Sequence, residues 1–169
     1  IVDLEAGDYR ASVLMAEVDG AGGQVNANAR LEALRIPGNA PGIFAGAPVL
    51  AKLTADLSAP RQLLRFSIQH PLSRLDGTAH MRGNQDLRVS WTIPSLAPFG
   101  AIAAADIAGS ASMVVSAARA GGKTTIALEG GMKTQGSTLL ARLLGHATLN
   151  ARAELSGNDF IMPRFTLDG

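Results

Sequence analysis

Apolar and polar residues alternate one by one along much of this chain. The clearest run is 145–155, where Ala147, Leu149, Ala151, Ala153 and Leu155 are apolar and the residues between them are polar or charged. A period of two places successive side chains on opposite faces of a strand, and one apolar face beside one wet face is typical of an antiparallel sheet. The run therefore predicts a β-strand.

The same alternation recurs along the chain and predicts eight or nine strands. It is present at 24–33, 48–57, 64–68, 87–93, 111–115, 124–128 and 161–167. Signals typical of tight turns lie between these runs. They are 19–23, Asp76 with Gly77, Gly83 with Asn84, Gly121 with Gly122, Gly130 with Gly131, and 156–159. Neighbouring strands are therefore expected to form mostly antiparallel hairpins.

Two stretches depart from the alternation. Residues 137–145 place four leucines at helical spacings, with Ser137 as the N-cap and Gly145 after the last turn, which predicts one short helix. We expect it to pack on the sheet, since it has few polar residues. Residues 94–105 mix two prolines with small apolar residues and predict an irregular connector.

A loose repeat suggests that the sheet is an array. Gly77, Gly109 and Gly145 each begin an alternating run, at roughly regular intervals. Repeated strand sets are typical of structures that grow along one axis, although an ordinary meander also places Gly before strands. The chain opens on Ile1 without an initiator Met, so we interpret residues 1–169 as a single β-rich segment of a longer repetitive protein.

Composition narrows the function classes. The chain has fifteen basic and fourteen acidic side chains, and their even scatter does not favour nucleic acid. The absence of Cys excludes disulfides, thiol catalysis and Cys-ligated zinc. No apolar run approaches the ~18 residues of a membrane helix.

Candidate catalytic and metal motifs have simpler interpretations. Residues 117–124 fit a relaxed phosphate-loop pattern, but an alternating strand follows in place of the helix that would hold a phosphate, so we predict a hairpin turn. The histidines His70, His80 and His146 are too scattered for a metal-ligand motif. No Gly-x-Ser-x-Gly elbow occurs. We predict no catalytic residue, no metal and no cofactor.

Function is therefore expected to lie in the apolar strand face. The residues predicted to line it are Val25, Ala27, Ala29, Leu31, Val49, Leu53, Leu57, Leu64, Phe66, Ile68, Leu87, Val89, Trp91, Met113, Val115, Ile126, Leu128, Leu149, Leu155, Phe165 and Leu167.

Two stretches resemble a known family. Residues 86–100, Asp-Leu-Arg-Val-Ser-Trp-Thr-Ile-Pro-Ser-Leu-Ala-Pro-Phe-Gly, resemble the strand and connector that recur in the TamB family, the periplasmic subunits of the translocation and assembly module. Residues 139–169 are similar to the helix–strand–strand unit of that family. The resemblance covers most of 64–169, and AsmA-like bridge proteins share the pattern.

The resemblance implies an all-β fold, an elongated, curved antiparallel sheet that forms a β-taco with an open groove, one short helix and irregular connectors. It implies a place in the periplasm of a Gram-negative bacterium, within a parent protein anchored in the inner membrane. The implied ligand is phospholipid, carried between the inner and outer membranes in support of outer-membrane protein and autotransporter assembly. The implied partner is a TamA-like outer-membrane barrel protein. Both the anchor and the barrel contact are expected outside this segment.

Physical chemistry is consistent with a lipid-carrying face. At ~0.8 kcal/mol per CH₂, a chain of about sixteen carbons costs roughly 12 kcal/mol to hold in water, so it needs an apolar wall. Two alternatives stay open. The chain is a sheet scaffold or chaperone that pairs with nascent outer-membrane strands, or a β-sandwich binding module whose apolar face is a dry core.

Overall fold

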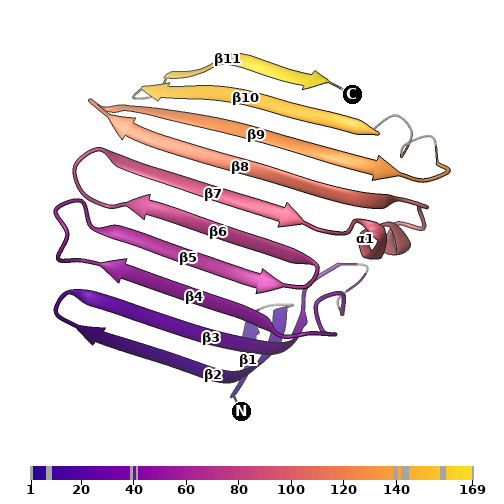
Figure 1. Ribbon diagram of the computed structural model, residues 1–169, viewed down its shortest axis with the longest axis horizontal. Helices are drawn as coiled ribbons and strands as arrows, with labels where there is room; N and C mark the ends of the chain where they lie inside the picture. The colour runs from indigo at the N-terminus through magenta and orange to yellow at the C-terminus, as the bar shows by residue number, and fades with distance from the viewer. Residues whose placement is uncertain are drawn as a thin grey trace.

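Eleven antiparallel strands form one sheet, in which each strand pairs with its neighbours in sequence (Figure 1). The computed structural model describes residues 2–6, 9–38, 40, 42–138, 141, 145–156 and 159–168. The strands are β1 (Val2–Ala6), β2 (Tyr9–Ala21), β3 (Gln24–Arg35), β4 (Val49–Asp56), β5 (Leu63–His70), β6 (Ser73–His80), β7 (Gln85–Ile93), β8 (Ala108–Ala120), β9 (Lys123–Gln135), β10 (His146–Ser156) and β11 (Asp159–Asp168).

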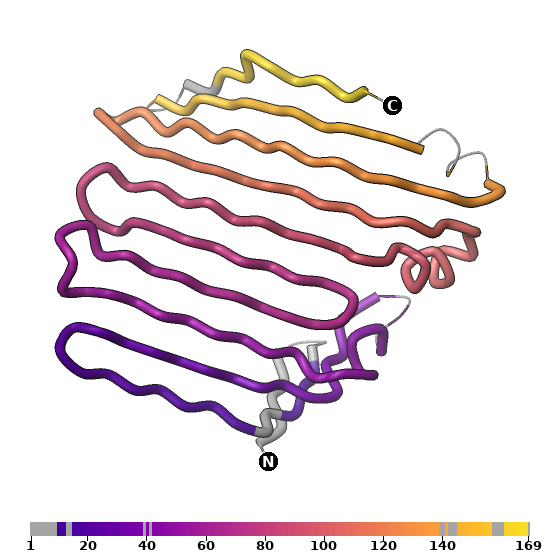
Figure 2. Tube along the Cα trace, in the orientation of Figure 1, coloured from indigo at the N-terminus to yellow at the C-terminus, as the bar shows by residue number. Residues whose placement is uncertain are grey.

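The sheet is open. Its order begins at β1 and ends at β11 without a pairing between these two strands. The described ends of the chain therefore lie at opposite sides of the sheet, as the trace in Figure 2 shows. The prediction of an all-β antiparallel sheet with an open face is confirmed.

The sheet is also a single layer. A compact protein of 17.4 kDa exposes ~7,900 Å² by the usual scaling of surface with mass, whereas this chain exposes 10832 Å². No large side chain is fully buried among the described residues. The buried apolar residues are small or medium in size: Ala11, Val49, Ala55, Ala141 and Ala147. Ordinary domains bury an apolar face under a second layer, and the described residues form none here.

Two of the predicted turns, Asp76 with Gly77 and Gly130 with Gly131, lie inside strands. Gly77 is in the middle of β6 and pairs with Phe66, whose ring occupies the place of its missing side chain. Gly130 and Gly131 are in the middle of β9, where both are paired with β8 and β10. The local turn preference of Gly is overridden because neighbouring strands hydrogen-bond these residues on both sides.

The prediction of a turn at Gly77 explains why β6 was missed, and its failure also weakens the predicted repeat. The prediction of eight or nine strands omitted β1, β2 and β6. Because Gly77 lies inside a strand while Gly109 and Gly145 lie at strand starts, the three glycines do not mark equivalent positions. The turns predicted at Gly83 and at Gly121 with Gly122 do join strands. Gly121 and Gly122 form the hairpin turn between β8 and β9 that was predicted for the phosphate-loop-like stretch.

A β-bulge interrupts the alternation predicted over 161–167, which had placed Ile161 on the same face as Phe165. The register of β10 and β11 shifts between Arg152 and Glu154, so one extra residue of β11 is accommodated there. Phe165 pairs with Ala151, but Ile161 pairs with Glu154. Ile161 thus lies on the opposite face from Phe165, since a bulge reverses the alternation.

The short helix lies in the stretch predicted to be irregular. Helix α1 (Ala97–Ile102) has Pro98 in its first turn, where the missing amide hydrogen is tolerated. Gly100 is buried, and a larger residue would not fit there because its Cβ would lie 2.8 Å from the carbonyl oxygens of Ala105 and Ile107. The helix predicted over 137–145 falls largely on 139–140 and 142–144, which lie outside the described residues.

The connections at the two ends of the strands differ. The long connectors 36–48, 94–107 and 136–145 all lie at one end, which also holds α1 (Figure 1). The other end has short turns, including Gly22 with Gly23 and Gly121 with Gly122. The connector end therefore carries more chain than the other end, where the longest described connection is the β4–β5 loop at 57–62.

Candidate functional site

Cross-strand pairing places the apolar residues in continuous rows. The central row runs from β2 to β11, and each member is paired with the next. Its members are Val18, Ala27, Leu53, Phe66, Gly77, Val89, Val115, Leu128, Ala151 and Phe165. Directly paired residues share a face of the sheet, so this row is one unbroken band.

Two further rows flank the first. One contains Ala16, Ala29, Ala51, Ile68, Leu75, Trp91, Met113, Gly130, Leu149 and Leu167. The other contains Val25, Ala55, Leu64, Ala79, Leu87, Ala117, Ile126 and Ala153. A short fourth row on the same side contains Ile93, Ala111, Met132 and Ala147. We call this whole side of the sheet, which also includes Leu31, Val49 and Leu155, the apolar face.

The register places every predicted lining residue except Leu57 on the apolar face. Leu57 lies just past the end of β4, is 43% exposed, and its amide donates a hydrogen bond of 2.7 Å to the Gly23 carbonyl. It is part of a connection between strands, so its place in the sequence alternation does not assign it to a face.

Sequence reasoning missed several members of the apolar face. Leu75 and Ala79 were missed with β6, and Ala16 and Val18 were missed with β2. Met132 was missed because the strand containing it was predicted to end before Gly130. A signal for β6 did exist, since Ser73, Leu75, Gly77 and Ala79 alternate with polar residues.

The opposite face is polar. We call it the polar face; in β3 to β10 it contains the ion pairs Arg30–Glu32, Arg74–Asp76 and Lys123–Glu154. The partners in the first two pairs lie two residues apart on one strand, as the period of two requires. All are exposed or half-buried, so each contributes little to stability.

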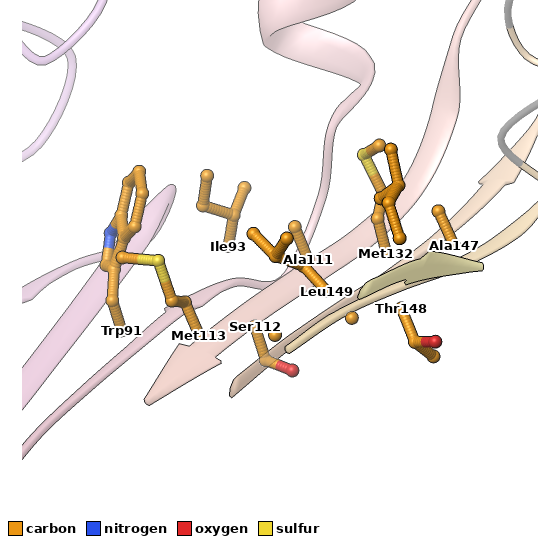
Figure 3. Close-up of a pocket in the computed structure, with 12 residues that line it drawn as sticks. Trp91, Ile93, Ala111, Ser112, Met113, Met132, Ala147, Thr148 and Leu149 are labelled. Atoms are coloured by element: carbon orange, nitrogen blue, oxygen red, sulfur yellow. The ribbon is translucent and has the colours of Figure 1, made fainter. Parts of the chain in front are cut away.

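A hollow of about 260 Å³ opens on the apolar face. Its floor includes Gly130, which has no side chain between its paired neighbours Met113 and Leu149. The surrounding side chains include Trp91, Ile93, Met113, Met132, Ala147 and Leu149, which rise from the same side of the strands, while Ser112 and Thr148 point to the other side (Figure 3). We call this the Trp91 hollow.

The Trp91 indole is held in place at its polar atom. Its Nε1–H donates a hydrogen bond of 2.7 Å to the Ser73 hydroxyl oxygen. The indole remains 38% exposed, so its ring forms part of the accessible wall of the Trp91 hollow. A tryptophan with a satisfied N–H and an open apolar face is suited to contact with an apolar ligand.

The connector end of the sheet covers part of the apolar face. Thr134 lies there in the alternation of β9, is buried, and its hydroxyl donates a hydrogen bond of 2.7 Å to the Ala141 carbonyl. Asp106 accepts hydrogen bonds from the amide and hydroxyl of Ser137 at 3.0 and 2.6 Å, and these bonds lower the pKa of Asp106. Two connectors are thereby tied together at this end.

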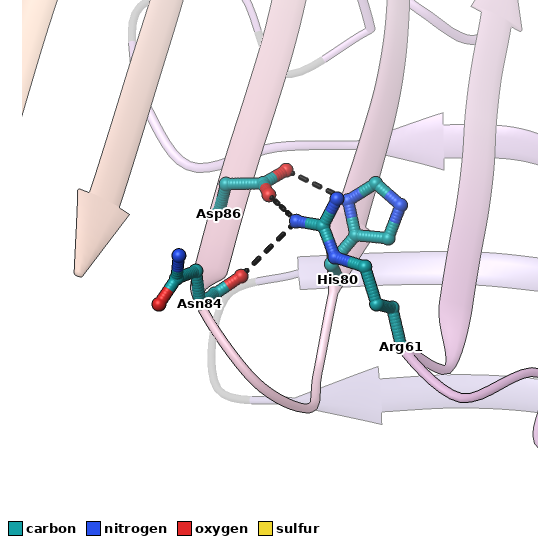
Figure 4. Close-up of polar contacts among 4 residues, drawn as sticks. All are labelled: Arg61, His80, Asn84 and Asp86. Atoms are coloured by element: carbon teal, nitrogen blue, oxygen red, sulfur yellow. Dashed lines mark hydrogen bonds and ion pairs between the residues drawn. The ribbon is translucent and has the colours of Figure 1, made fainter. Parts of the chain in front are cut away.

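At the opposite end, a polar cluster joins two connections. The Asp86 carboxylate accepts a hydrogen bond of 2.6 Å from the Arg61 guanidinium and lies 2.9 Å from Nδ1 of His80 (Figure 4). Arg61 also donates to the carbonyl of Asn84 at 3.2 Å. Hydrogen bonding to His80, with a smaller contribution from Arg61, lowers the pKa of Asp86. The cluster fastens the β4–β5 loop to the β6–β7 turn.

The histidines lie in three separate places. His70 meets Phe44 edge to face at 5.1 Å, His80 lies beside Asp86, and His146 is on the polar face. No group of three or more His, Cys, Asp or Glu in the described ranges is arranged to hold a metal ion. No helix in the described part of the chain has the length and apolar character needed to cross a membrane.

Comparison with known proteins gives no relative. The chain matches no protein-family model, no curated protein and no solved structure.

Proposed function

We propose that this chain is a segment of a TamB-like envelope protein whose apolar face holds phospholipid acyl chains. The observation that supports this most directly is the apolar face itself, which extends across β2 to β11 without a covering layer among the described residues. A soluble protein rarely exposes a continuous apolar surface of this extent unless the surface binds something.

The apolar face exposes large apolar side chains, whose contact with water is unfavourable in free energy. Val18 is 72% exposed, and Phe165 and Leu167 are each 62% exposed. Each square ångström of apolar surface removed from water contributes about 25 cal/mol, so a ligand gains most by covering many neighbouring residues at once. An acyl chain is long, flexible and wholly apolar, and meets this requirement.

The proposal places the segment in the periplasm of a Gram-negative bacterium, within a parent protein anchored in the inner membrane. Phospholipid would move along the face between the two membranes, in support of outer-membrane protein assembly. A TamA-like barrel protein would be met by another part of the parent. No catalytic step is assigned to the segment.

A strand-pairing scaffold is the second candidate, and the open sheet edge favours it. Among the described strands β11 pairs only with β10, so its outer edge offers backbone groups to an incoming strand. Pro163 and the bulge lie within β11, however, and both features weaken pairing along a sheet edge. The apolar face therefore supports the lipid function more strongly.

Lipid extraction from the purified protein tests the proposal. The protein should be expressed in a Gram-negative periplasm, purified without detergent and analysed by native mass spectrometry. We expect adducts with the masses of phospholipids, and the same lipids in a chloroform extract. A protein that carries no lipid, and that takes up none from vesicles while its sheet stays folded, would refute the proposed function.

A further inference from the structure

The apolar face has one permanently charged residue in β3 to β10, counted over the described residues. Arg119 pairs with Gln85 on one side and Thr124 on the other, at the end of the strands that has short turns. Its side chain is exposed and makes no hydrogen bond or ion pair with any described residue. The other charged side chains of these strands alternate onto the polar face.

The surroundings of Arg119 are suited to the junction between a polar head and an apolar tail. A hollow of about 350 Å³ beside Arg119 is lined by Met81, Leu87 and Ala117, and also by the polar residues Gln85 and Thr124. Asp86 and His80 border the same hollow. The Asp86 carboxylate is already bound by Arg61 and His80, so Arg119 remains available to an anion.

The spacing between Arg119 and the Trp91 hollow matches the length of an acyl chain. Arg119 lies six residues beyond Met113 in β8, and Met113 pairs with Trp91. At ~3.4 Å per residue this spans roughly 20 Å, about the length of an extended acyl chain of sixteen carbons. Beyond the Trp91 hollow, the contact between Thr134 and Ala141 covers the connector end.

We propose that a phospholipid binds with its phosphodiester at Arg119 and one acyl chain lying parallel to β8, so that the methyl end of the chain reaches the Trp91 hollow. The charge complementarity between Arg119 and phosphate fixes the direction of the lipid on the face. The inference rests on the proposed function, and it adds a ligand orientation and a headgroup site.

Quenching of Trp91 tests the orientation directly, because Trp91 is the sole tryptophan of the chain. The probes are phosphatidylglycerols brominated near the headgroup, at mid-chain or near the methyl end, presented in mixed detergent micelles. We expect quenching to rise steadily towards the methyl end. Arg119→Glu should weaken binding about tenfold and flatten this gradient, since a charge-assisted hydrogen bond becomes a repulsion. Arg119→Lys should keep the gradient, and Arg88→Glu on the polar face is the matched control.

The outcomes separate the two proposals. Lipid binding with a flat or reversed gradient, or with no dependence on Arg119, overturns the orientation while leaving the proposed function intact. Absence of quenching by every brominated lipid, together with absence of co-purified lipid, overturns both. Shielding of Trp91 by an outer-membrane strand peptide, with no quenching by lipid, would identify a polypeptide as the occupant and likewise overturn the assignment.

Discussion

The ring of Phe66 lies over the backbone of its cross-strand partner Gly77, at the centre of the apolar face. A Cβ added at Gly77 would collide with three atoms of that ring. The glycine thus makes room for the aromatic residue, and the aromatic residue shields a backbone that has no side chain of its own. The pair acts as a single packing unit between β5 and β6.

Gly77→Ala is expected to destabilise the sheet by about 2 kcal/mol, because the added methyl group must displace the Phe66 ring. Chemical denaturation followed by circular dichroism measures this change. Gly131→Ala is the matched control, because Gly131 is also in a strand interior and a Cβ there meets only the Ala147 carbonyl oxygen at an ordinary 3.7 Å. In the Phe66→Leu background the cost of Gly77→Ala should shrink; an unchanged cost would contradict the pairing of these two residues.

Adjacent valines in β8 provide a test of the two faces. Val115 is on the apolar face and Val114 is on the polar face, and both are half-buried. Val115→Asp is expected to reduce lipid binding at least tenfold, because a carboxylate in contact with an acyl chain must lose its hydration. Val114→Asp should bind lipid normally. Native mass spectrometry gives the lipid occupancy, and circular dichroism checks that both variants remain folded.

Gly130→Val is expected to fill part of the Trp91 hollow and to shift binding towards shorter acyl chains. A Cβ at Gly130 lies 3.3 Å from the Ser112 carbonyl oxygen, so the strand must shift slightly to accept it. Competition among phosphatidylglycerols of graded chain length measures the shift. Gly131→Val places the same side chain on the polar face and should leave the preference unchanged. Equal preferences in the two variants would show that the hollow does not receive the end of the chain.

Stability should fall as the pH falls below about 6.5, because His70 is held neutral. Burial lowers the pKa of His70, and the nearby carbonyls of Ala47 and Phe44 offset this only in part. Nδ1 also accepts a hydrogen bond of 3.1 Å from the Leu72 amide, which a protonated Nδ1 cannot do. The unfolded chain therefore takes up the proton first, and stability is full above the unfolded pKa and declines below it.

Measurement of the unfolding free energy between pH 5 and pH 8 tests this behaviour. His70→Asn retains an acceptor for the Leu72 amide but does not titrate, so its stability should vary less over this range. A slope unaffected by His70→Asn would place the titrating group elsewhere.

Acid should loosen the cluster of Arg61, His80 and Asp86. The pKa of Asp86 is lowered by its hydrogen bond with His80 and, less strongly, by Arg61. A lowered carboxyl pKa contributes stability above the unfolded value near 3.9, and this contribution is lost as the pH falls through the folded value. Protection of the Met81 and Arg82 amides, which bond to the carbonyl of Arg61, should report the loss in hydrogen-exchange experiments. Asp86→Asn should reduce this protection at neutral pH already.

Strand faces were more predictable from the sequence than strand ends. The alternation around Leu53, Val89 and Leu149 predicted which residues share a face, because one apolar side and one wet side leave a strand little choice of orientation. Gly77 and Gly130 misled the prediction of turns, since their place inside strands depends on partners distant in sequence, such as Phe66. The reversal at Ile161 was hidden for the same reason, because a bulge is a property of two paired strands.

The Trp91 hollow and the place of Arg119 were beyond prediction. The hollow requires Met113, Gly130 and Leu149 to meet across three strands, and their register is set by the intervening connections. Arg119 lies in the stretch that fits a phosphate-loop pattern, where its significance was obscured by a motif that the hairpin excludes. Arg119 can be recognised as a candidate anion site only once the register shows that the neighbouring rows are apolar.

Because the sheet has open edges, the width of the apolar face depends on the number of strands. Strands are spaced about 4.8 Å apart, so the eleven strands extend about 48 Å across, and one more hairpin would widen the surface by about 10 Å. No closure condition of the kind that fixes the size of a barrel limits this growth. A sheet of this design can be matched to a required reach by inserting or deleting hairpins, with the chemistry of each row unchanged.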